Sequence, residues 1–245
     1  IIDYCFTREN GIVLSGKIRI IFDRMTRHIQ SFHTYTPFQS AYRKYHSTET
    51  ALLKIQNDLL LSIDKTKVSA LVLLDLSAAF DTIDHSILLG RLESWFGISG
   101  CALELLSSYL KDRTESVLIQ ASSSCPLPVS TGVLQGSVFG PLLFTLYTTP
   151  VSYVIADNDI PFHLYADDTD QLYLSFGTND SQSNLDRLSL TLDKVYSWFT
   201  ENRLTLNASK TEFLIIGNRQ QRSKLAPLSV CINGSNISES KSARN

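Results

Sequence analysis

The stretch VSALVLLDL, residues 68–76, decides the fold. It is a short, continuous, β-rich apolar run, which is typical of a strand buried on both faces. Two further apolar runs, residues 162–166 and 171–176, flank the neighbouring acids Asp167 and Asp168. This spacing predicts a β-hairpin that carries the two acids near its turn.

Helical patterns surround these strands. Ser47-Thr-Glu-Thr50 opens a helix that runs to about Ser62, with Thr48 as the expected cap. Asp84 is expected to cap a further helix that ends at Gly97. The clearest apolar stripe at helical spacing is formed by Leu185, Leu188, Leu192, Val195 and Phe199. Because strands and helices alternate and include a hairpin, the sequence favours an α+β fold, with a mixed or antiparallel sheet and helices on one face.

The composition narrows the class of protein. The 245 residues allow one large domain or two small ones, and 43% apolar with 19% charged residues indicates a globular chain. No apolar run is long enough to span a bilayer, and the N-terminus has neither an initiator Met nor a signal pattern. We therefore expect no membrane association, an intracellular location and a piece of a longer protein. The four cysteines form no CxxC pair, which disfavours a zinc site.

The formal charge of −2 argues against a broadly basic surface for nucleic acid. Basic residues nevertheless cluster at Arg19–Arg27, Arg43-Lys44 and Arg219–Lys224. A carboxylate-based metal site would also contribute negative charge of its own.

Three aspartates are the candidate metal ligands. Asp75 stands at the end of a segment too apolar to hold an unpaired charge, and adjacent Asp167 and Asp168 repel each other. The plain alternatives are a strand-end acid that reaches solvent and a polar β-turn. A divalent cation would offset the repulsion, and oxygen ligands suit Mg²⁺. If the strand before Asp75 lies beside the hairpin, the three acids converge on a site for two ions about 3.5–4 Å apart.

Five motifs occur in order along the chain. They are Phe38–Arg43 (FQSAYR) with His46–Ala51 (HSTETA), Leu74–His85 (LDLSAAFDTIDH), Gly132–Pro141 (GVLQGSVFGP), Tyr165–Asp168 (YADD), and Asn202–Asn207 (NRLTLN) with Lys210–Phe213 (KTEF). Together they resemble the reverse transcriptases of non-LTR (LINE-type) retrotransposons, over about residues 16–217. The resemblance implies a right-hand polymerase palm with partial fingers. It also implies RNA-directed DNA polymerase activity, with an RNA template, a DNA primer, dNTPs and two Mg²⁺ ions, or Mn²⁺ in their place.

The resemblance assigns catalytic roles to the acids. Asp75 and Asp167 would bind both metal ions, and Asp168 would assist. Lys210 would be a general acid near the pyrophosphate. The plain alternative for Lys210 is a solvated surface lysine.

Other residues would bind the nucleotide. Phe80 would be the aromatic gate against the sugar 2′ position, Gln135 would position nucleotide and template, and Arg43 would contact the triphosphate. Gly132 and Gly136 would allow close backbone approach. The plain alternatives are a core aromatic, a loop amide and a solvated arginine, respectively.

Two departures from the family pattern bear on activity. Leu134 replaces a proline, which affects loop rigidity rather than chemistry. Asp170 is one residue more than the family has between Asp168 and the Gln-Leu-Tyr that follows. Because a one-residue slip turns every later side chain to the opposite face, Asp170 predicts a bulge or a distorted hairpin, with reduced or absent activity.

The expected organisation is partial fingers over residues 1–66, a palm-centred core over 67–217, and the end of the palm or the start of a thumb over 218–245. The endonuclease and a complete thumb would lie elsewhere in the parent polyprotein, and nucleus and cytoplasm are expected from the family. Two alternatives stay open. One is a degenerate, non-catalytic palm that holds nucleic acid, and the other is a palm-fold enzyme acting on small nucleotides, which the Gly-x-x-Gln-Gly loop disfavours.

Overall fold

The structure is a computed structural model that describes residues 3–4, 11–31, 36–119, 122–134, 136–165, 170–207 and 209–240; of residues 3–4, 11–19 and 170 it describes only the backbone. Two compact units share the chain. The first comprises Ile1–Tyr35 and Phe80–Tyr147, and the second comprises Thr36–Ala79 and Thr148–Asn245. Each unit is described by itself below.

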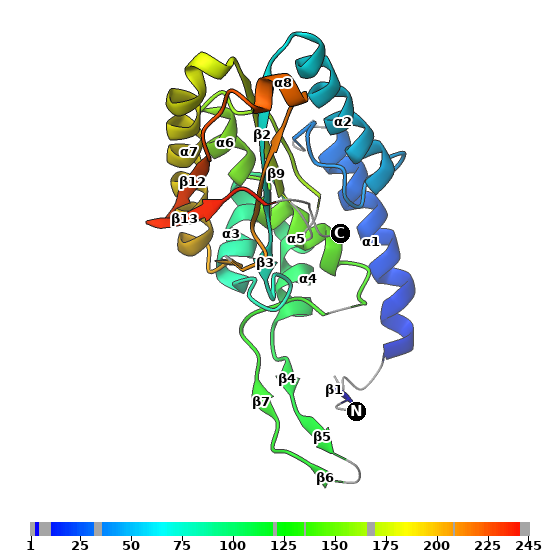
Figure 1. Ribbon diagram of the computed structural model, residues 1–245. Coiled ribbons are helices and arrows are strands. Elements are labelled where there is room, and N and C mark those ends of the chain that lie inside the picture. The colour runs from blue at the N-terminus through cyan, green and yellow to red at the C-terminus, as the bar shows by residue number, and fades with distance from the viewer. Residues whose placement is uncertain are drawn as a thin grey trace. The chain divides into compact units, whose positions relative to one another are not determined.

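A four-stranded antiparallel sheet forms the centre of the second unit (Figure 1). Its order is β11 (Glu212–Ile216), β2 (Val68–Leu74), β9 (Asp170–Phe176) and β8 (Phe162–His163). The pairing of β2 with β9 is continuous, from Val68 opposite Phe176 to Leu74 opposite Asp170. The runs expected to form the hairpin are thus strands β8 and β9, paired with each other.

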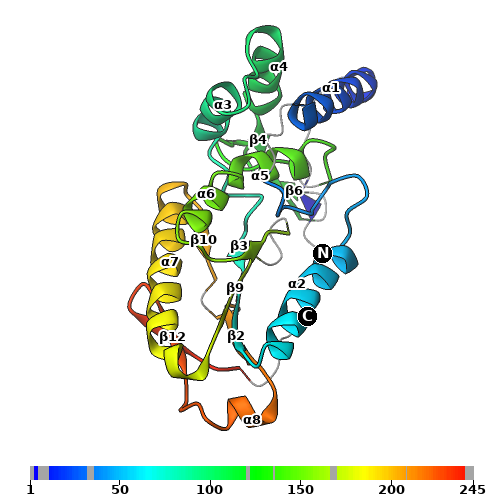
Figure 2. The same ribbon diagram turned by 90° about the horizontal axis from the view of Figure 1, so that it is seen from above.

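Helices cover both faces of this sheet. Helices α6 (Val151–Ala156) and α7 (Ser181–Glu201) lie on one side of β2 and β9, and α2 (Thr48–Asp64) lies on the other (Figure 1, Figure 2). The expectation of helices on one face is therefore wrong for this unit, although the α+β class is confirmed. The physical reason is the composition of β2, in which six of seven residues are buried, because an apolar strand of this kind needs cover on both sides.

Helix α2 begins with a capping box. The Ser47 hydroxyl accepts a hydrogen bond from the amide of Thr50, and the Thr50 hydroxyl accepts one from the amide of Ser47. The predicted cap, Thr48, is wrong by one residue, since Thr48 is already helical. Further along, Ile55 and Leu59 pack against Leu71 of β2 and Tyr173 of β9.

A buried tyrosine ties α2 to the sheet. The Tyr173 hydroxyl donates a hydrogen bond to the Asp58 carboxylate of α2. Burial, followed by this carboxylate, raises the pKa of Tyr173 above its usual range. Tyr173 therefore stays a neutral donor at physiological pH.

The remaining elements of the second unit frame the sheet. A short pair joins β3 (Leu76–Ser77) to β10 (Thr205–Leu206), and a hairpin joins β12 (Ser229–Ile232) to β13 (Ser235–Ser238). The predicted stripe of α7 is buried along its length. A 3₁₀ turn, η1 (Thr178–Asp180), precedes α7, and α8 (Arg219–Arg222) follows β11.

The first unit is mainly helical, with short strand pairs. Its helices are α1 (Gly11–Ser31), α3 (His85–Ser94), α4 (Gly100–Leu110) and α5 (Gly140–Thr148). Its strands are β1 (Asp3–Tyr4), β4 (Thr114–Glu115), β5 (Val117–Ile119), β6 (Ser122–Ser123) and β7 (Leu127–Pro128). The predicted cap of α3 is confirmed, because Asp84 accepts hydrogen bonds from the amides of Ser86 and Ile87. No helix in the described part of the chain has the length and apolar character to cross a membrane.

Two neighbouring leucines of α2 test how this helix packs on the sheet. Leu59 is 9% exposed and packs on the sheet, whereas Leu60 is 53% exposed. Leu59→Ala should lower the free energy of unfolding by about 2–5 kcal/mol, because it leaves a cavity under the helix. Leu60→Ala should change it by less than about 0.5 kcal/mol. Urea unfolding of both variants measures the difference, and equal losses would contradict the packing described.

Candidate active site

Asp75 follows directly after β2, at the end of the β2–β9 ladder. Its backbone carbonyl accepts a hydrogen bond of 2.8 Å from the amide of Asn207. Its side chain is 22% exposed, yet Oδ1 is buried and makes no hydrogen bond within the described residues. The Lys210 ammonium forms an ion pair with this carboxylate, with Nζ 3.5 Å from Oδ1. Asp75 thus presents a desolvated carboxylate oxygen that is only loosely neutralised.

Asn207 organises the turn that carries Lys210. Its carbonyl accepts hydrogen bonds from the amides of Lys210 and Thr211, and its side-chain oxygen accepts one from the Ser209 hydroxyl. Because the amide of Asn207 is also bonded to Asp75, one residue fixes both the acid and the lysine. Asn207 belongs to the motif Asn202–Asn207, but no role for it was predicted from the sequence. The available signal was the turn-forming composition of Asn207-Ala-Ser-Lys210.

The arms of the hairpin that carries the two predicted acids are described, and its turn is not. Asp167 and Asp168 lie outside the described residues, and of Asp170 only the backbone is described. From Asp170 to Phe176, β9 keeps one register with β2, so no bulge interrupts it there. The expected adjustment to the extra residue is absent from β9 over these seven residues.

The last described residue before the acids is Tyr165. Its hydroxyl accepts a hydrogen bond of 2.9 Å from the Thr48 hydroxyl, in the first turn of α2. This bond joins the hairpin to a helix that begins 117 residues earlier in the chain. It is available because Ser47, rather than Thr48, caps the helix.

A buried histidine makes a second link of this kind. His163 of β8 shares a 2.8 Å hydrogen bond between Nε2 and the Ser40 hydroxyl, and its Nδ1 has no partner within the described ranges. Burial, followed by the charges of Lys54 and His46, lowers the pKa of His163. The imidazole is therefore neutral at pH 7 and acts as a structural tie, which the sequence analysis did not anticipate.

Arg43 donates hydrogen bonds within the loop before α2. One terminal nitrogen of its guanidinium donates to the carbonyls of Gln39, at 2.8 Å, and Thr36, at 3.3 Å. The predicted contact of Arg43 with a triphosphate stays a prediction.

In the first unit, hydrogen bonds join the glycine-rich loop to the motif that contains Phe80. The amide of Gly132 bonds to the carbonyl of Ile83 at 2.8 Å, and the amide of Val133 bonds to the carbonyl of Phe80 at 2.9 Å. The Gly132 carbonyl accepts from His85 Nε2 and from Arg113. The Phe80 ring packs on Phe144 with centroids 5.0 Å apart.

The two loop glycines differ in their surroundings. Gly132 has φ +80°, and a Cβ there would lie 2.9 Å from the carbonyl oxygen of Asp81. Gly136 has φ +76°, but a Cβ would meet nothing within 4 Å. Close approach of backbone is thus observed at Gly132, while Gly136 needs glycine only for its dihedral angle. Gln135, between them, lies outside the described residues.

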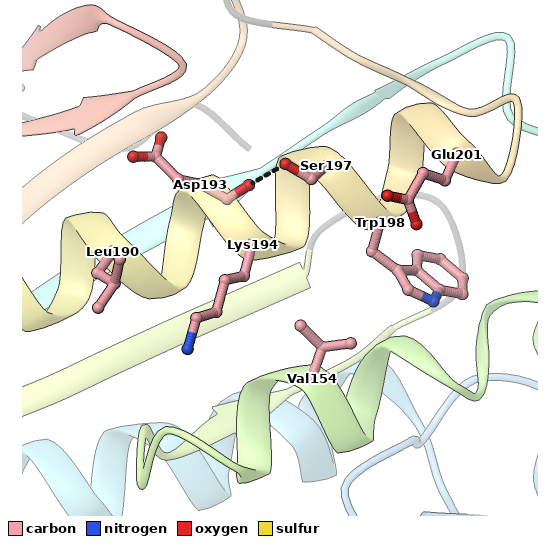
Figure 3. Close-up of a pocket in the computed structure, with 7 residues that line it drawn as sticks. All are labelled: Val154, Leu190, Asp193, Lys194, Ser197, Trp198 and Glu201. Atoms are coloured by element: carbon pink, nitrogen blue, oxygen red, sulfur yellow. Dashed lines mark hydrogen bonds between the residues drawn. The ribbon is translucent and has the colours of Figure 1, made fainter.

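A pocket of about 330 Å³ lies in the second unit, between Val154 of α6 and α7. Figure 3 shows Leu190, Lys194 and Trp198 of α7 at this pocket. None of the predicted site residues lines it. Within the described ranges, no group of three His, Cys, Asp or Glu side chains could hold a metal ion. The candidate site is therefore defined by Asp75 and its surroundings rather than by a cavity.

The fold is that of right-hand polymerases. The chain superposes on telomerase from Candida albicans, solved with a TWJ fragment of telomeric RNA, with a TM-score of 0.59, 15% identity and coverage of 93% of this chain and 37% of the other. For apo telomerase from Candida tropicalis the TM-score is 0.61, at 14% identity, over 85% of this chain and 44% of the other. These similarities confirm the predicted α+β palm architecture.

The chain belongs to the reverse transcriptase (RNA-dependent DNA polymerase) family, whose model matches residues 11–237. It is 30% identical over 198 residues to a probable RNA-directed DNA polymerase from transposon BS of Drosophila melanogaster, covering 79% of this chain. It is 29% identical over 212 residues to the RNA-directed DNA polymerase from mobile element jockey of the same organism, covering 83%. The predicted resemblance to non-LTR reverse transcriptases is confirmed. The chain spans 21% and 22% of the length of these two relatives.

Gly132 and Gly136 form a matched pair for substitution. Alanine at either position meets the same unfavourable positive φ, at a cost of about 1 kcal/mol. Only Gly132→Ala adds a clash with the backbone of Asp81. We expect Gly132→Ala to destabilise the chain by at least about 1–3 kcal/mol more than Gly136→Ala, since overpacking at a fixed backbone adds to the strain. Urea unfolding of both variants measures this, and a larger loss at Gly136 would contradict the loop geometry.

Proposed function

We propose that this chain is the catalytic core segment of an RNA-directed DNA polymerase. It would transfer a nucleotidyl group from a dNTP to the 3′-hydroxyl of a DNA primer paired with an RNA template. The family and the names of the relatives support the class of reaction. In this proposal residues 1–66 are partial fingers, 67–217 the palm-centred core, and 218–245 the end of the palm or the start of a thumb. We propose nucleus and cytoplasm as its locations on the resemblance only.

The observation that carries the proposal is the buried oxygen of Asp75. A carboxylate oxygen shielded from water without a hydrogen bond is unfavourable unless a cation reaches it. Divalent magnesium or manganese fits such an oxygen. Asp75 therefore fits the role of a metal ligand, which supports the first part of the proposed site.

The position of β9 supports the second part. Strand β9 begins at Asp170, opposite Leu74, the residue before Asp75. Asp168 and Asp167 precede Asp170 by two and three residues in the sequence. A chain extends at most about 3.3–3.6 Å per residue, so these acids are tethered within reach of Asp75. We propose that the three carboxylates together hold the two ions.

The reaction follows from these roles. The bound ions would supply Lewis-acid chemistry, lowering the pKa of the primer 3′-hydroxyl and neutralising the triphosphate. The bond between the 3′-oxygen and the α-phosphorus forms as the bond from that phosphorus to the bridging oxygen breaks. The 3′-hydroxyl loses its proton to solvent, and pyrophosphate leaves. Lys210, whose ammonium lies 3.5 Å from Asp75, is the proposed donor of a proton to the pyrophosphate.

Binding of the nucleotide is assigned by the resemblance. Phe80 is the proposed gate at the sugar 2′ position, Gln135 the proposed contact to nucleotide and template, and Arg43 the proposed contact to the triphosphate. The amide-to-carbonyl bond between Val133 and Phe80 supports a joint role for the two motifs that contain Phe80 and Gln135.

Asp75→Asn tests the metal site. We expect primer extension on an RNA template to fall by more than the roughly 10- to 100-fold that loss of an outer-shell partner costs. Mn²⁺ binding measured by electron paramagnetic resonance should weaken in parallel, which gives a readout independent of turnover. Asp157→Asn, at an exposed acid after α6, is the matched control and should change neither. Unchanged Mn²⁺ affinity in Asp75→Asn would refute the assignment.

Asp170 tests whether the extra residue limits activity. Because β9 keeps its register from Asp170 onward, any adjustment to this residue must fall before it. Deletion of Asp170 should therefore raise Mg²⁺-dependent extension, whereas Asp170→Asn, which keeps the chain length, should not. Equal, robust activity with and without Asp170 would sink the idea.

A further inference from the structure

The segment before α2 has a buried base and an exposed rim. Gln39, Ser40 and Ala41 form the base and are almost completely buried. Tyr42 to His46 form the rim, which we call the tyrosine rim, and four of its five residues are exposed. Both parts belong to the second unit.

Hydrogen bonds hold the base in place. Gln39 bridges to Leu164, just after β8, and the amide of Ser40 donates to the Leu164 carbonyl at 3.1 Å. The Gln39 side chain accepts from the amide of Ala41 at 2.9 Å, and Arg43 bonds to the Gln39 carbonyl. The tyrosine rim therefore follows a base that these hydrogen bonds hold in place.

Two tyrosines of the rim adopt a backbone conformation that bulky residues rarely take. Tyr42 has φ +56° and Tyr45 has φ +66°. Tyr45 is 86% exposed, so packing against the described part of the unit does little to offset its strain. Strain of this kind, of about 1–3 kcal/mol, gathers at sites of function. The Tyr45 ring is exposed to solvent above a buried, hydrogen-bonded base, an arrangement that points to a ligand covering the ring.

The rim also carries positive charge. The Lys44 ammonium lies 4.8 Å from the centre of the Tyr45 ring, a cation–π contact that helps to orient the ring. Arg43 and His46 stand on either side in sequence, and the His46 ring bonds to the Lys44 carbonyl at 3.0 Å. An aromatic face beside cations is the combination that binds single-stranded nucleic acid.

We propose that Tyr45 stacks on an unpaired base of a single-stranded nucleic acid, while Lys44 contacts its phosphates. This inference rests on the proposed function, which supplies the strand: the template before it pairs. A hydrogen bond close to the tyrosine rim connects it to the proposed catalytic hairpin. Thr48, three residues after Tyr45, bonds to Tyr165, which precedes Asp167 by two residues.

Other ligands fit the rim less well. A duplex offers no open base face to Tyr45. A triphosphate, the ligand assigned to Arg43, needs cations but no exposed ring. The rim therefore fits an unpaired strand better than either.

The test measures binding of the 245-residue chain to a fluorescein-labelled, unstructured RNA oligonucleotide by anisotropy, without dNTPs. Tyr45→Ala should weaken binding by roughly 5- to 100-fold, the range for loss of one base–aromatic stack. Tyr45→Phe, which keeps the ring, should bind as the parent does. Tyr153→Ala, at another exposed tyrosine of this unit, is the control and should have no effect. Lys44→Met should reduce the salt dependence by about 0.7 in log–log slope, as for one phosphate contact.

The outcomes separate this inference from the proposed function. Unchanged RNA affinity in Tyr45→Ala, with circular dichroism confirming the fold, overturns the stacking role even if the chain extends primers. The stacking role is also overturned if Tyr45→Phe binds RNA as weakly as Tyr45→Ala, because the contact would then be made by the hydroxyl rather than by the ring. Tyr45-dependent binding with no extension in the parent chain supports the stacking role while the proposed catalysis fails.

Discussion

The antiparallel pairing of β2 with β9 constrains the whole second unit. It runs through seven consecutive residue pairs, from Val68–Phe176 to Leu74–Asp170. Side chains alternate along a strand, so a shift of one residue would exchange Tyr173, which faces α2, with the residues of the opposite face. The ladder ends at Leu74, and Asp75 is the next residue. Asp75 therefore lies just beyond the apolar ladder, next to Leu74, which pairs with the first residue of β9.

Stability does not account for Asp75. A buried oxygen without a hydrogen bond costs about 1–3 kcal/mol, and more when it is charged. The ion pair with Lys210, whose side chain is 65% exposed, returns at most about 1 kcal/mol. A neutral residue of similar size would therefore suit the folded chain as well or better. A carboxylate that weakens the fold where it stands therefore supports the proposal that Asp75 is a metal ligand.

Local signals in the sequence predicted local structure well. Asp84 was identified as a cap, and the apolar runs on either side of the hairpin acids were identified as paired strands, because caps and hairpins depend on neighbouring residues. Contacts between distant segments could not be predicted. The bonds from Thr48 to Tyr165 and from Ser40 to His163 join residues more than a hundred positions apart and follow no periodicity. The error about helices on one face was avoidable, since VSALVLL already indicated a strand covered on both sides.

The charge of the chain bears on how it would hold nucleic acid. A formal charge of −2 gives little general attraction for phosphates. One guanidinium nitrogen of Arg43 also donates hydrogen bonds to backbone carbonyls of its own loop. Affinity must then come from a few placed contacts rather than from a broad basic surface. Stacking contributes about 1–3 kcal/mol per base and depends weakly on salt, unlike phosphate contacts. An exposed tyrosine on a rigid base would suit the proposed polymerase core, which is short of positive charge.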